Sequence, residues 1–112
     1  MNEESQAVRT FKRRLVKELL DYIILKYLRQ QSKVAGYDLI RQINQDYEIL
    51  LSSGTVYAKL YSLERKGLIK GEWGERKREF VLTKMGKRNI DAILNDPLGK
   101  TIFLMIEKPS KK

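Results

Sequence analysis

Apolar residues recur at intervals of three and four positions along residues 53–66, which predicts a helix with one apolar side. That side consists of Val56, Leu60 and Leu63. The opposite side is small or hydroxyl-bearing over its first two turns, where a solvated helix face usually carries long charged side chains. Ser52 or Ser53 can cap the start of this helix, and Gly67 suits the left-handed residue after its end. The pattern predicts a helix that can bring its backbone close to another surface.

An alternating pattern follows directly and predicts two short strands joined by a charged turn. Ile69, Gly71 and Trp73 alternate with charged residues and would form the half-buried side of the first strand. Phe80 and Leu82 would be their counterparts across the hairpin. Three cations cluster at or beside the turn: Arg76, Lys77 and Arg78. A charged hairpin tip is often only a solubility device, but directly after a helix with a small polar face we expect it to contact phosphates.

The segment from Leu19 to Leu28 is apolar around most of its circumference, which is more than one small core requires. A basic amphipathic stretch, residues 8–15, precedes it and can join the same helix. A helix with one solvent-exposed side would not be this apolar, so we expect a second subunit to cover part of this helix. The side chains expected at that interface are Leu20, Ile24 and Tyr27.

Two further helices and one short strand complete the predicted elements. Residues 37–45 form the helix that precedes the one with the small face. Its inward row is Tyr37, Ile40 and Ile43. Residues 49–51 predict a short strand that can pair with the hairpin, and Thr83 can cap a last helix. The buried row of that last helix is Ile90, Ile93 and Leu94.

An apolar run, residues 101–106, lies close to the end of the sequence and follows a turn at 96–99. A run this apolar would not be left in water. It either packs on its own domain, as a strand or as a helix, or meets a partner subunit. Residues 107–112 form a polar, basic tail, and residues 1–8 are expected to be disordered.

Four motifs occur in a characteristic order along the chain. They are GYDLI at 36–40, SGTVY at 53–57, LERKGLI at 63–69 and LTKMGK at 82–87. The LERKGLI motif recurs in winged helices generally, whereas the ordered set is specific. Together these motifs resemble the PadR family of winged-helix transcriptional regulators over residues 19–94.

The resemblance implies a dimeric, DNA-binding repressor in which the helix at 53–66 enters DNA and the hairpin is the wing. Resemblance and the small exposed face together assign DNA contacts on the helix to Ser53, Gly54, Thr55, Tyr57, Lys59 and Ser62. The wing contacts would come from Arg76, Lys77 and Arg78. In this family both chain ends join the dimer, which favours a partner subunit over Ile102, Phe103 and Met105. Gly54 and Ala58 could instead pack against a neighbouring helix.

This sequence departs from the family pattern in three places. Ala58 stands where the family often has proline, and the aromatic pair before the LT motif is reduced to Phe80-Val81. The C-terminal region is short, whereas many relatives hold small effectors through a longer one. Some relatives use a tryptophan there, but the single tryptophan of this chain, Trp73, lies in the predicted wing. Effector binding therefore does not carry over, and a small-molecule effector is not indicated.

The net charge of +9 favours an anionic partner, nucleic acid first and a membrane surface second. Its distribution is uneven, because residues 1–34 and 84–112 each carry about +4 while residues 35–83 are nearly neutral. Charge therefore does not identify the central helix as the reader. The two ends would supply much of the non-specific attraction to DNA.

The chain contains neither cysteine nor histidine, which excludes disulfides, thiol catalysis, the common metal sites and imidazole chemistry. No paired-carboxylate or phosphate-loop motif compensates for this. We expect no catalytic residue, no metal and no cofactor, so the protein is not expected to be an enzyme. Without a signal-peptide pattern or a membrane-spanning apolar run, it is expected to be cytoplasmic and free of the membrane.

The sequence thus predicts a mainly α protein with a small β-hairpin, an α+β winged helix-turn-helix with extra terminal segments for dimerisation. The predicted regions are residues 1–8, a DNA-binding domain at 9–95 and a short C-terminal segment at 96–112. We expect a homodimer that represses transcription by binding double-stranded DNA at a palindromic operator. Two alternatives are a winged-helix module for protein contacts and a sequence-indifferent architectural DNA binder.

Overall fold

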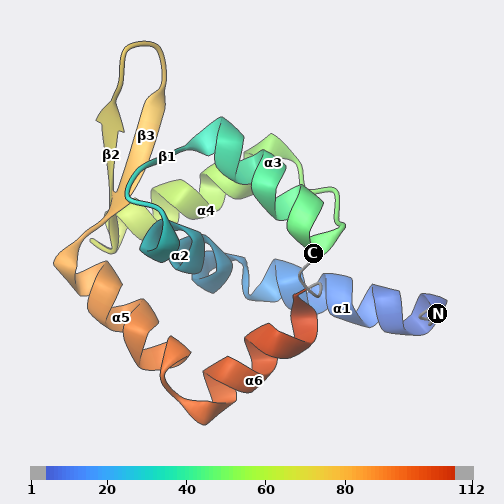
Figure 1. The fold of residues 1–112 in the computed structure, drawn as a ribbon. Coiled ribbons are helices and arrows are strands. Elements are labelled where there is room, and N and C mark those ends of the chain that lie inside the picture. The colour runs from blue at the N-terminus through green and yellow to red at the C-terminus, as the bar shows by residue number, and fades with distance from the viewer. Residues whose placement is uncertain (1–4, 108–112) are drawn as a thin grey trace.

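The computed structural model describes residues 5–107 of the 112-residue chain, and they form a helical structure with one small sheet. The elements are α1 (Gln6–Glu18), α2 (Leu20–Gln30), β1 (Val34–Ala35), α3 (Gly36–Tyr47), α4 (Ser53–Arg65), β2 (Ile69–Trp73), β3 (Arg78–Leu82), α5 (Lys84–Leu94) and α6 (Pro97–Ile106). Figure 1 shows α2 at the centre, α3 and α4 on one side of it, α5 on the other, and the β2–β3 hairpin projecting at one end. The predicted fold class, mainly α with a hairpin, is confirmed.

The sheet is antiparallel with the order β1-β3-β2, so the hairpin gains a third strand. That strand is Val34–Ala35, in which Val34 lies opposite Phe80. The sequence prediction of a strand at 49–51 is wrong. This segment is irregular: the side chain of Asn44 accepts the N–H of Leu51 at 3.0 Å, and the backbone oxygen of Asn44 accepts the N–H of Ile49 at 3.1 Å. Hydrogen bonds that go to Asn44 are not available for a strand ladder.

The apolar circumference of α2 is satisfied within one protomer. Leu20 and Ile24 have no exposed surface, and α2 contacts α4, α5 and β3. Tyr27 is 9% exposed, and its hydroxyl donates a hydrogen bond to the carboxylate of Asp46 in α3. The prediction that these three side chains meet a second subunit is therefore wrong, because the protomer's own elements already cover them.

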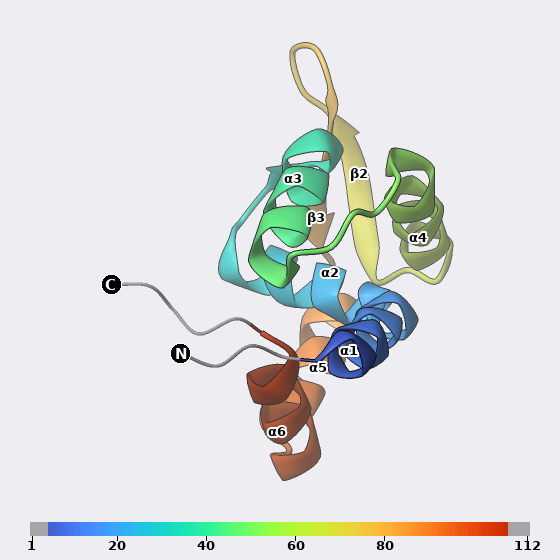
Figure 2. The same cartoon turned by 90° about the vertical axis from the view of Figure 1, so that its right-hand side faces the viewer.

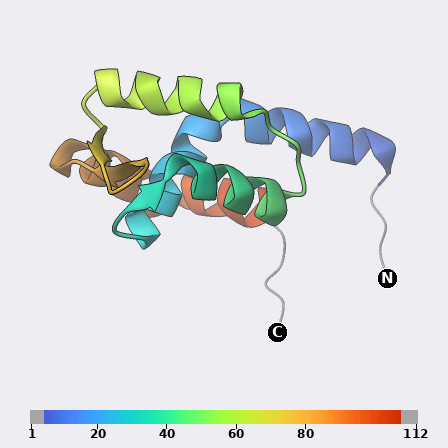
Figure 3. The ribbon, with the colours of Figure 1, turned by 90° about the horizontal axis from the view of Figure 1, so that it is seen from above.

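The N-terminal helix begins earlier than the sequence suggests. Ser5 caps α1 by accepting the N–H of Val8 at 3.1 Å, so residues 6–8 are helical, and residues 1–4 lie outside the described part of the chain. Helices α1 and α2 almost join, as expected. They are separated only at Leu19, whose φ of −99° and ψ of 17° lie off the helical values. Figure 3 shows α1 extending past the ends of α3 and α4.

The apolar run near the end of the chain is a helix, α6, and its two sides differ. Phe103 is buried against the protomer's own core, Ile102 is half-buried, and Met105 is 65% exposed. Beyond α6, the carboxylate of Glu107 pairs with Lys26 of α2 and accepts the Tyr47 hydroxyl at 3.2 Å. The expectation that a partner covers this run fails for Phe103, because the core takes that side. The basic tail predicted at 108–112 lies outside the described residues.

Two aromatic residues expected to face inward are exposed instead. Tyr37 is 65% exposed, because the buried row of α3 runs through Leu39 and Ile43 rather than through position 37. Trp73 is 76% exposed, because the hairpin extends beyond the edge of the core. Strand alternation assigns a side chain to a face, but it does not tell whether core lies under that face. Among residues 5–107, no helix has the length and apolarity that a membrane crossing needs.

Candidate nucleic-acid interface

The first turns of α4 are open on the side opposite the core. Ser52 caps the helix by accepting the N–H of Thr55 at 3.1 Å, and the two hydroxyl oxygens lie 2.9 Å apart. Ser53, Gly54 and Thr55 are all exposed. A Cβ atom built on Gly54 would meet only Ser52 Oγ, at 3.9 Å, and Ala58 is exposed as well. Within the protomer, Gly54 and Ala58 therefore do not serve to pack against a neighbouring helix.

Tyr57 has a structural position that the sequence did not indicate. Its ring is half-buried, and its hydroxyl occupies the space next to Gly36, where a Cβ atom would lie 2.5 Å away. The side chain thus packs α4 against the first residue of α3.

Lys59 and Ser62 are half-buried, whereas Tyr61, not predicted as a site residue, is 42% exposed. The periodicity could have indicated Tyr61, because it lies one helical turn after Tyr57.

Arg78 connects the wing to α4 rather than pointing away from the turn. Its guanidinium nitrogens lie 2.9 and 3.3 Å from the two carboxylate oxygens of Glu64 in α4. The same carboxylate accepts the N–H of Gly71 at 3.1 Å. We call Glu64, Gly71 and Arg78 the wing clasp. The phosphate contact expected of Arg78 stays a prediction, and the structure adds that the Glu64 carboxylate already engages its charge.

The charges of the wing clasp perturb each other in the expected direction. The hydrogen bonds from Arg78 and from the backbone of Gly71 hold the pKa of Glu64 below its usual value of 4.5. Bonding to Glu64 also raises the pKa of Arg78. The guanidinium of Arg78 further lies 5.4 Å from the ring centre of Phe80 and 5.9 Å from that of Tyr61. Near neutral pH the carboxylate of Glu64 and the guanidinium of Arg78 therefore both carry their charge, which favours the contact between them.

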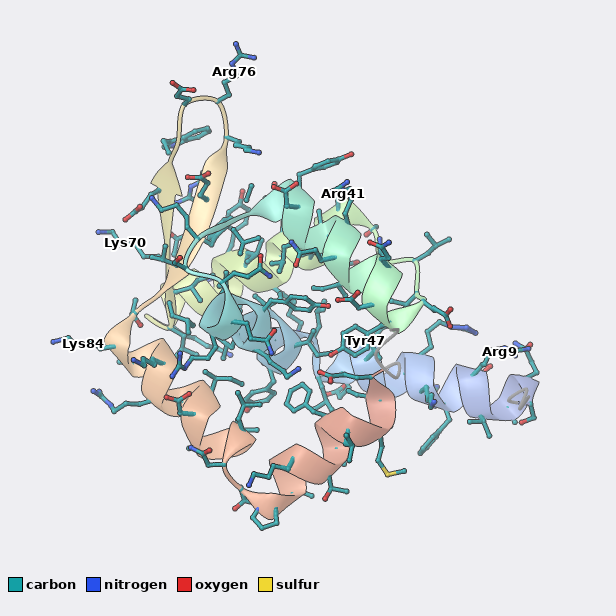
Figure 4. All side chains as sticks on the ribbon, in the orientation of Figure 1. Arg9, Arg41, Tyr47, Lys70, Arg76 and Lys84 are labelled. Carbon is teal, nitrogen blue, oxygen red and sulfur yellow. The ribbon has the colours of Figure 1, made fainter. Side chains whose placement is uncertain are left out.

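The tip of the wing is more open than its base. The N–H of Gly74 donates to the backbone oxygen of Lys77 at 2.7 Å, which closes the turn. Arg76 extends from this turn away from the helices, as Figure 4 shows. Lys77 is exposed and lies 3.7 Å from a carboxylate oxygen of Asp38 in α3. The structure thus brings Arg76 and Lys77 together at the tip and removes Arg78 from it.

The described part of the chain offers nothing comparable for a metal. Across residues 5–107, no group of three or more acidic, histidine or cysteine side chains is placed to hold an ion. The open face of α4 and the cationic wing tip are therefore the strongest functional features in this range.

Comparison with known proteins identifies the family to which the chain belongs. The model of the family described as "Transcriptional regulator PadR-like family" matches residues 24–92, which is more than half of the chain. No curated protein matches the chain.

A PadR family transcription regulator from Clostridium difficile R20291 shares 26% identity at a TM-score of 0.64, over 79% of this chain and 90% of that one. F-93 of SSV1 shares 26% identity at a TM-score of 0.61, over 76% of this chain and 87% of that one. PadR of Bacillus subtilis, solved in complex with operator DNA, shares 22% identity at a TM-score of 0.61, over 84% of this chain and 51% of that one. The chain belongs to the PadR-like family of transcriptional regulators and has its winged-helix fold.

Proposed function

We propose that this protein is a homodimeric repressor that binds a specific DNA operator through α4 and the wing. The observation that carries the proposal is the open face of α4 beside a cationic hairpin tip. Ser53, Gly54 and Thr55 leave room for a groove wall within reach of the helix backbone. Lys59 and Ser62 lie further along the helix and can extend the contact. The operator-bound structure of the similar Bacillus subtilis PadR supports a DNA ligand.

The start of α4 also suits a phosphate. The first N–H groups of a helix have no partner within the helix, and the helix dipole favours an anion there. Ser52 takes the N–H of Thr55, so the N–H groups of Ser53 and Gly54 remain for a ligand. Arg76 and Lys77 of the wing would hold the flanking phosphates, and Arg78 would keep the wing at its angle to α4.

The homodimer would form through α1 and α6, which contact each other and lie side by side at one end of the protomer (Figure 2). Both helices leave apolar side chains in water: Phe11 is 65%, Leu104 79% and Met105 65% exposed. These three replace Leu20, Ile24 and Tyr27 as our proposed interface residues. A two-fold axis would place the two α4 helices on half-sites about one DNA turn apart, or a multiple of that.

Titration against DNA at several salt concentrations tests the function. The probes are a labelled duplex from the region upstream of the gene and a scrambled duplex of equal composition, followed by fluorescence anisotropy. Tight, selective binding to the upstream duplex supports the repressor. Equal binding to both, with a steep salt dependence, would instead identify an architectural binder, and no binding near physiological salt would contradict the DNA-binding proposal.

Mass in solution tests the dimer separately. Light scattering is expected to give twice the protomer mass of 13.2 kDa, and Met105→Glu is expected to shift the mass toward the monomer. A monomeric wild-type protein would remove the basis for a palindromic operator.

A further inference from the structure

Trp73 is the most conspicuous apolar side chain of the wing that the fold leaves without a role. It lies directly opposite Arg78 in the hairpin, and directly opposed residues of an antiparallel pair share one face of the sheet. The next pair on the same face is Gly71 with Phe80, and Phe80 is fully buried. Along one face, the hairpin thus passes from full burial to a tryptophan that is 76% exposed.

This face of the wing is turned toward α4. The guanidinium of Arg78 reaches Glu64 of α4 and lies 5.9 Å from the ring centre of Tyr61, also of α4. Trp73 forms a cross-strand pair with Arg78 on this same face, and Figure 2 shows the hairpin rising past α4. Tyr61, Arg78 and Trp73 therefore form a continuous strip from the reading helix to the wing, which we call the aromatic strip.

The chemistry of the aromatic strip differs from that of the wing tip. Glu64 compensates the charge of Arg78 at 2.9 Å, so the strip offers flat, apolar and π surface with little free charge. Arg76 and Lys77, just beyond it, offer cations. A surface with this order matches a DNA groove, in which sugars and base edges lie between the phosphates of two strands. Apolar side chains are used in this way by proteins that contact the minor groove.

We infer that Trp73, supported by Tyr61 and Arg78, packs against sugars and base edges of the minor groove next to the major groove that α4 enters. The inference rests on the proposed function, since it requires DNA along α4. Trp73 would add affinity without neutralising a phosphate, and it would make the wing sensitive to groove shape. Arg78 acts as a positioning residue that holds the indole at a fixed distance from the reading helix.

Trp73 is the single tryptophan of the chain, so its fluorescence reports on this contact directly. The upstream duplex is titrated into the full-length wild-type protein while two signals are recorded: duplex anisotropy and tryptophan emission. Emission is expected to change and to saturate at the same duplex concentration as anisotropy. Trp73→Ala is expected to weaken binding about tenfold, the cost of truncating one large apolar contact, and Trp73→Phe less. The salt slope of the affinity is expected to stay constant in both variants, because no cation is removed.

Met85→Ala is the matched control, because it removes another exposed apolar side chain, 51% exposed, from the first turn of α5. It should bind as the wild type does, and circular dichroism should give equal melting temperatures for all variants. Constant emission during binding, or an unchanged Kd for Trp73→Ala, would overturn the inference and leave the proposed function standing. Emission that changes with protein concentration alone would assign Trp73 to a protein contact and would overturn it too. If anisotropy shows no binding by the wild type, the proposed function fails first.

Discussion

The base and the tip of the β2–β3 hairpin differ in burial and in their contacts with the rest of the protomer. At the base, Phe80 is fully buried, Ile69 is 2% exposed, and Arg78 is held by Glu64. Toward the tip, Trp73 at the end of β2 and Arg76 in the turn are exposed. The strands are continuous from one to the other, yet the base joins the protomer's core and the tip adds almost nothing to it. The contribution to stability and the proposed DNA contact are thus separated along a few residues, so mutations in the two parts should have separable effects.

The largest expected effect is the loss of the buried ring at the base. Phe80→Ala should lower the free energy of unfolding by about 3–5 kcal/mol, because it empties a fully buried site on β3, the strand that lies between β1 and β2. Urea denaturation followed by circular dichroism measures this. Trp73 belongs to the next cross-strand pair on the same face, and Trp73→Ala should change the free energy of unfolding by less than about 0.5 kcal/mol. Equal losses for the two variants would show that the division between base and tip is wrong.

Crowding the wing clasp should have the next largest effect. A Cβ atom on Gly71 would lie 2.5 Å from a guanidinium nitrogen of Arg78, so in Gly71→Ala the guanidinium must shift, and we expect its pairing with Glu64 to weaken. We expect a loss of about 1–2 kcal/mol in the free energy of unfolding. Gly54→Ala is the control at an uncrowded glycine, and it should leave stability unchanged or raised. A neutral Gly71→Ala would mean that Arg78 contributes little to holding the wing.

Removing the charge of the clasp should have a smaller and pH-dependent effect. Glu64→Gln is expected to cost about 1 kcal/mol at pH 7, because the ion pair is partly open to solvent. The pKa of Glu64 is lowered on folding, so its stabilisation is present above pH 4.5 and fades as acid protonates the carboxylate. Urea denaturation at pH 7 and pH 3 should show the difference between wild type and variant shrinking in acid. A difference that grows in acid would contradict the assigned pKa shift.

The smallest effect on stability is expected at the tip. Arg76→Ala should change the free energy of unfolding by less than about 0.5 kcal/mol. It should still weaken binding to every DNA sequence alike and reduce the salt slope by about 0.9, the value for one phosphate contact. Thr55→Ala, in contrast, should change discrimination between sequences. The opposite pattern would mean that the roles of wing and reading helix are exchanged.

Features decided by neighbouring residues could be predicted from the sequence. The apolar row of α4, its cap at Ser52 and the cap of α5 at Thr83 depend on contacts within one turn, and the structure confirms them. The hairpin is confirmed as well, with Gly71 opposite Phe80 and Ile69 opposite Leu82, because alternation along each strand decides which residues share a face. The four ordered motifs indicated the PadR family, which hydrophobic periodicity alone would not have identified.

Features decided by distant partners were missed. Leu20 and Ile24 were expected at a dimer interface, because an apolar helix has the same pattern whether its own domain or a second subunit covers it. The pairing of Arg78 with Glu64 was not foreseen, because Glu64 lies fourteen positions earlier on another element. Val34–Ala35 is too short to show strand alternation, and it pairs with Phe80 from across the chain. In each case the missing information was the tertiary neighbour.

The contact between Gly36 and Tyr57 bears on how this sequence can evolve. Gly36 has no side chain at the point where the large side chain of Tyr57 lies, so the pair sets the distance between α3 and α4. A side chain at position 36 would have to displace the end of the Tyr57 side chain, and a smaller residue at position 57 would leave the space beside Gly36 unfilled. The two positions, twenty-one residues apart, should therefore covary among relatives as one inherited unit.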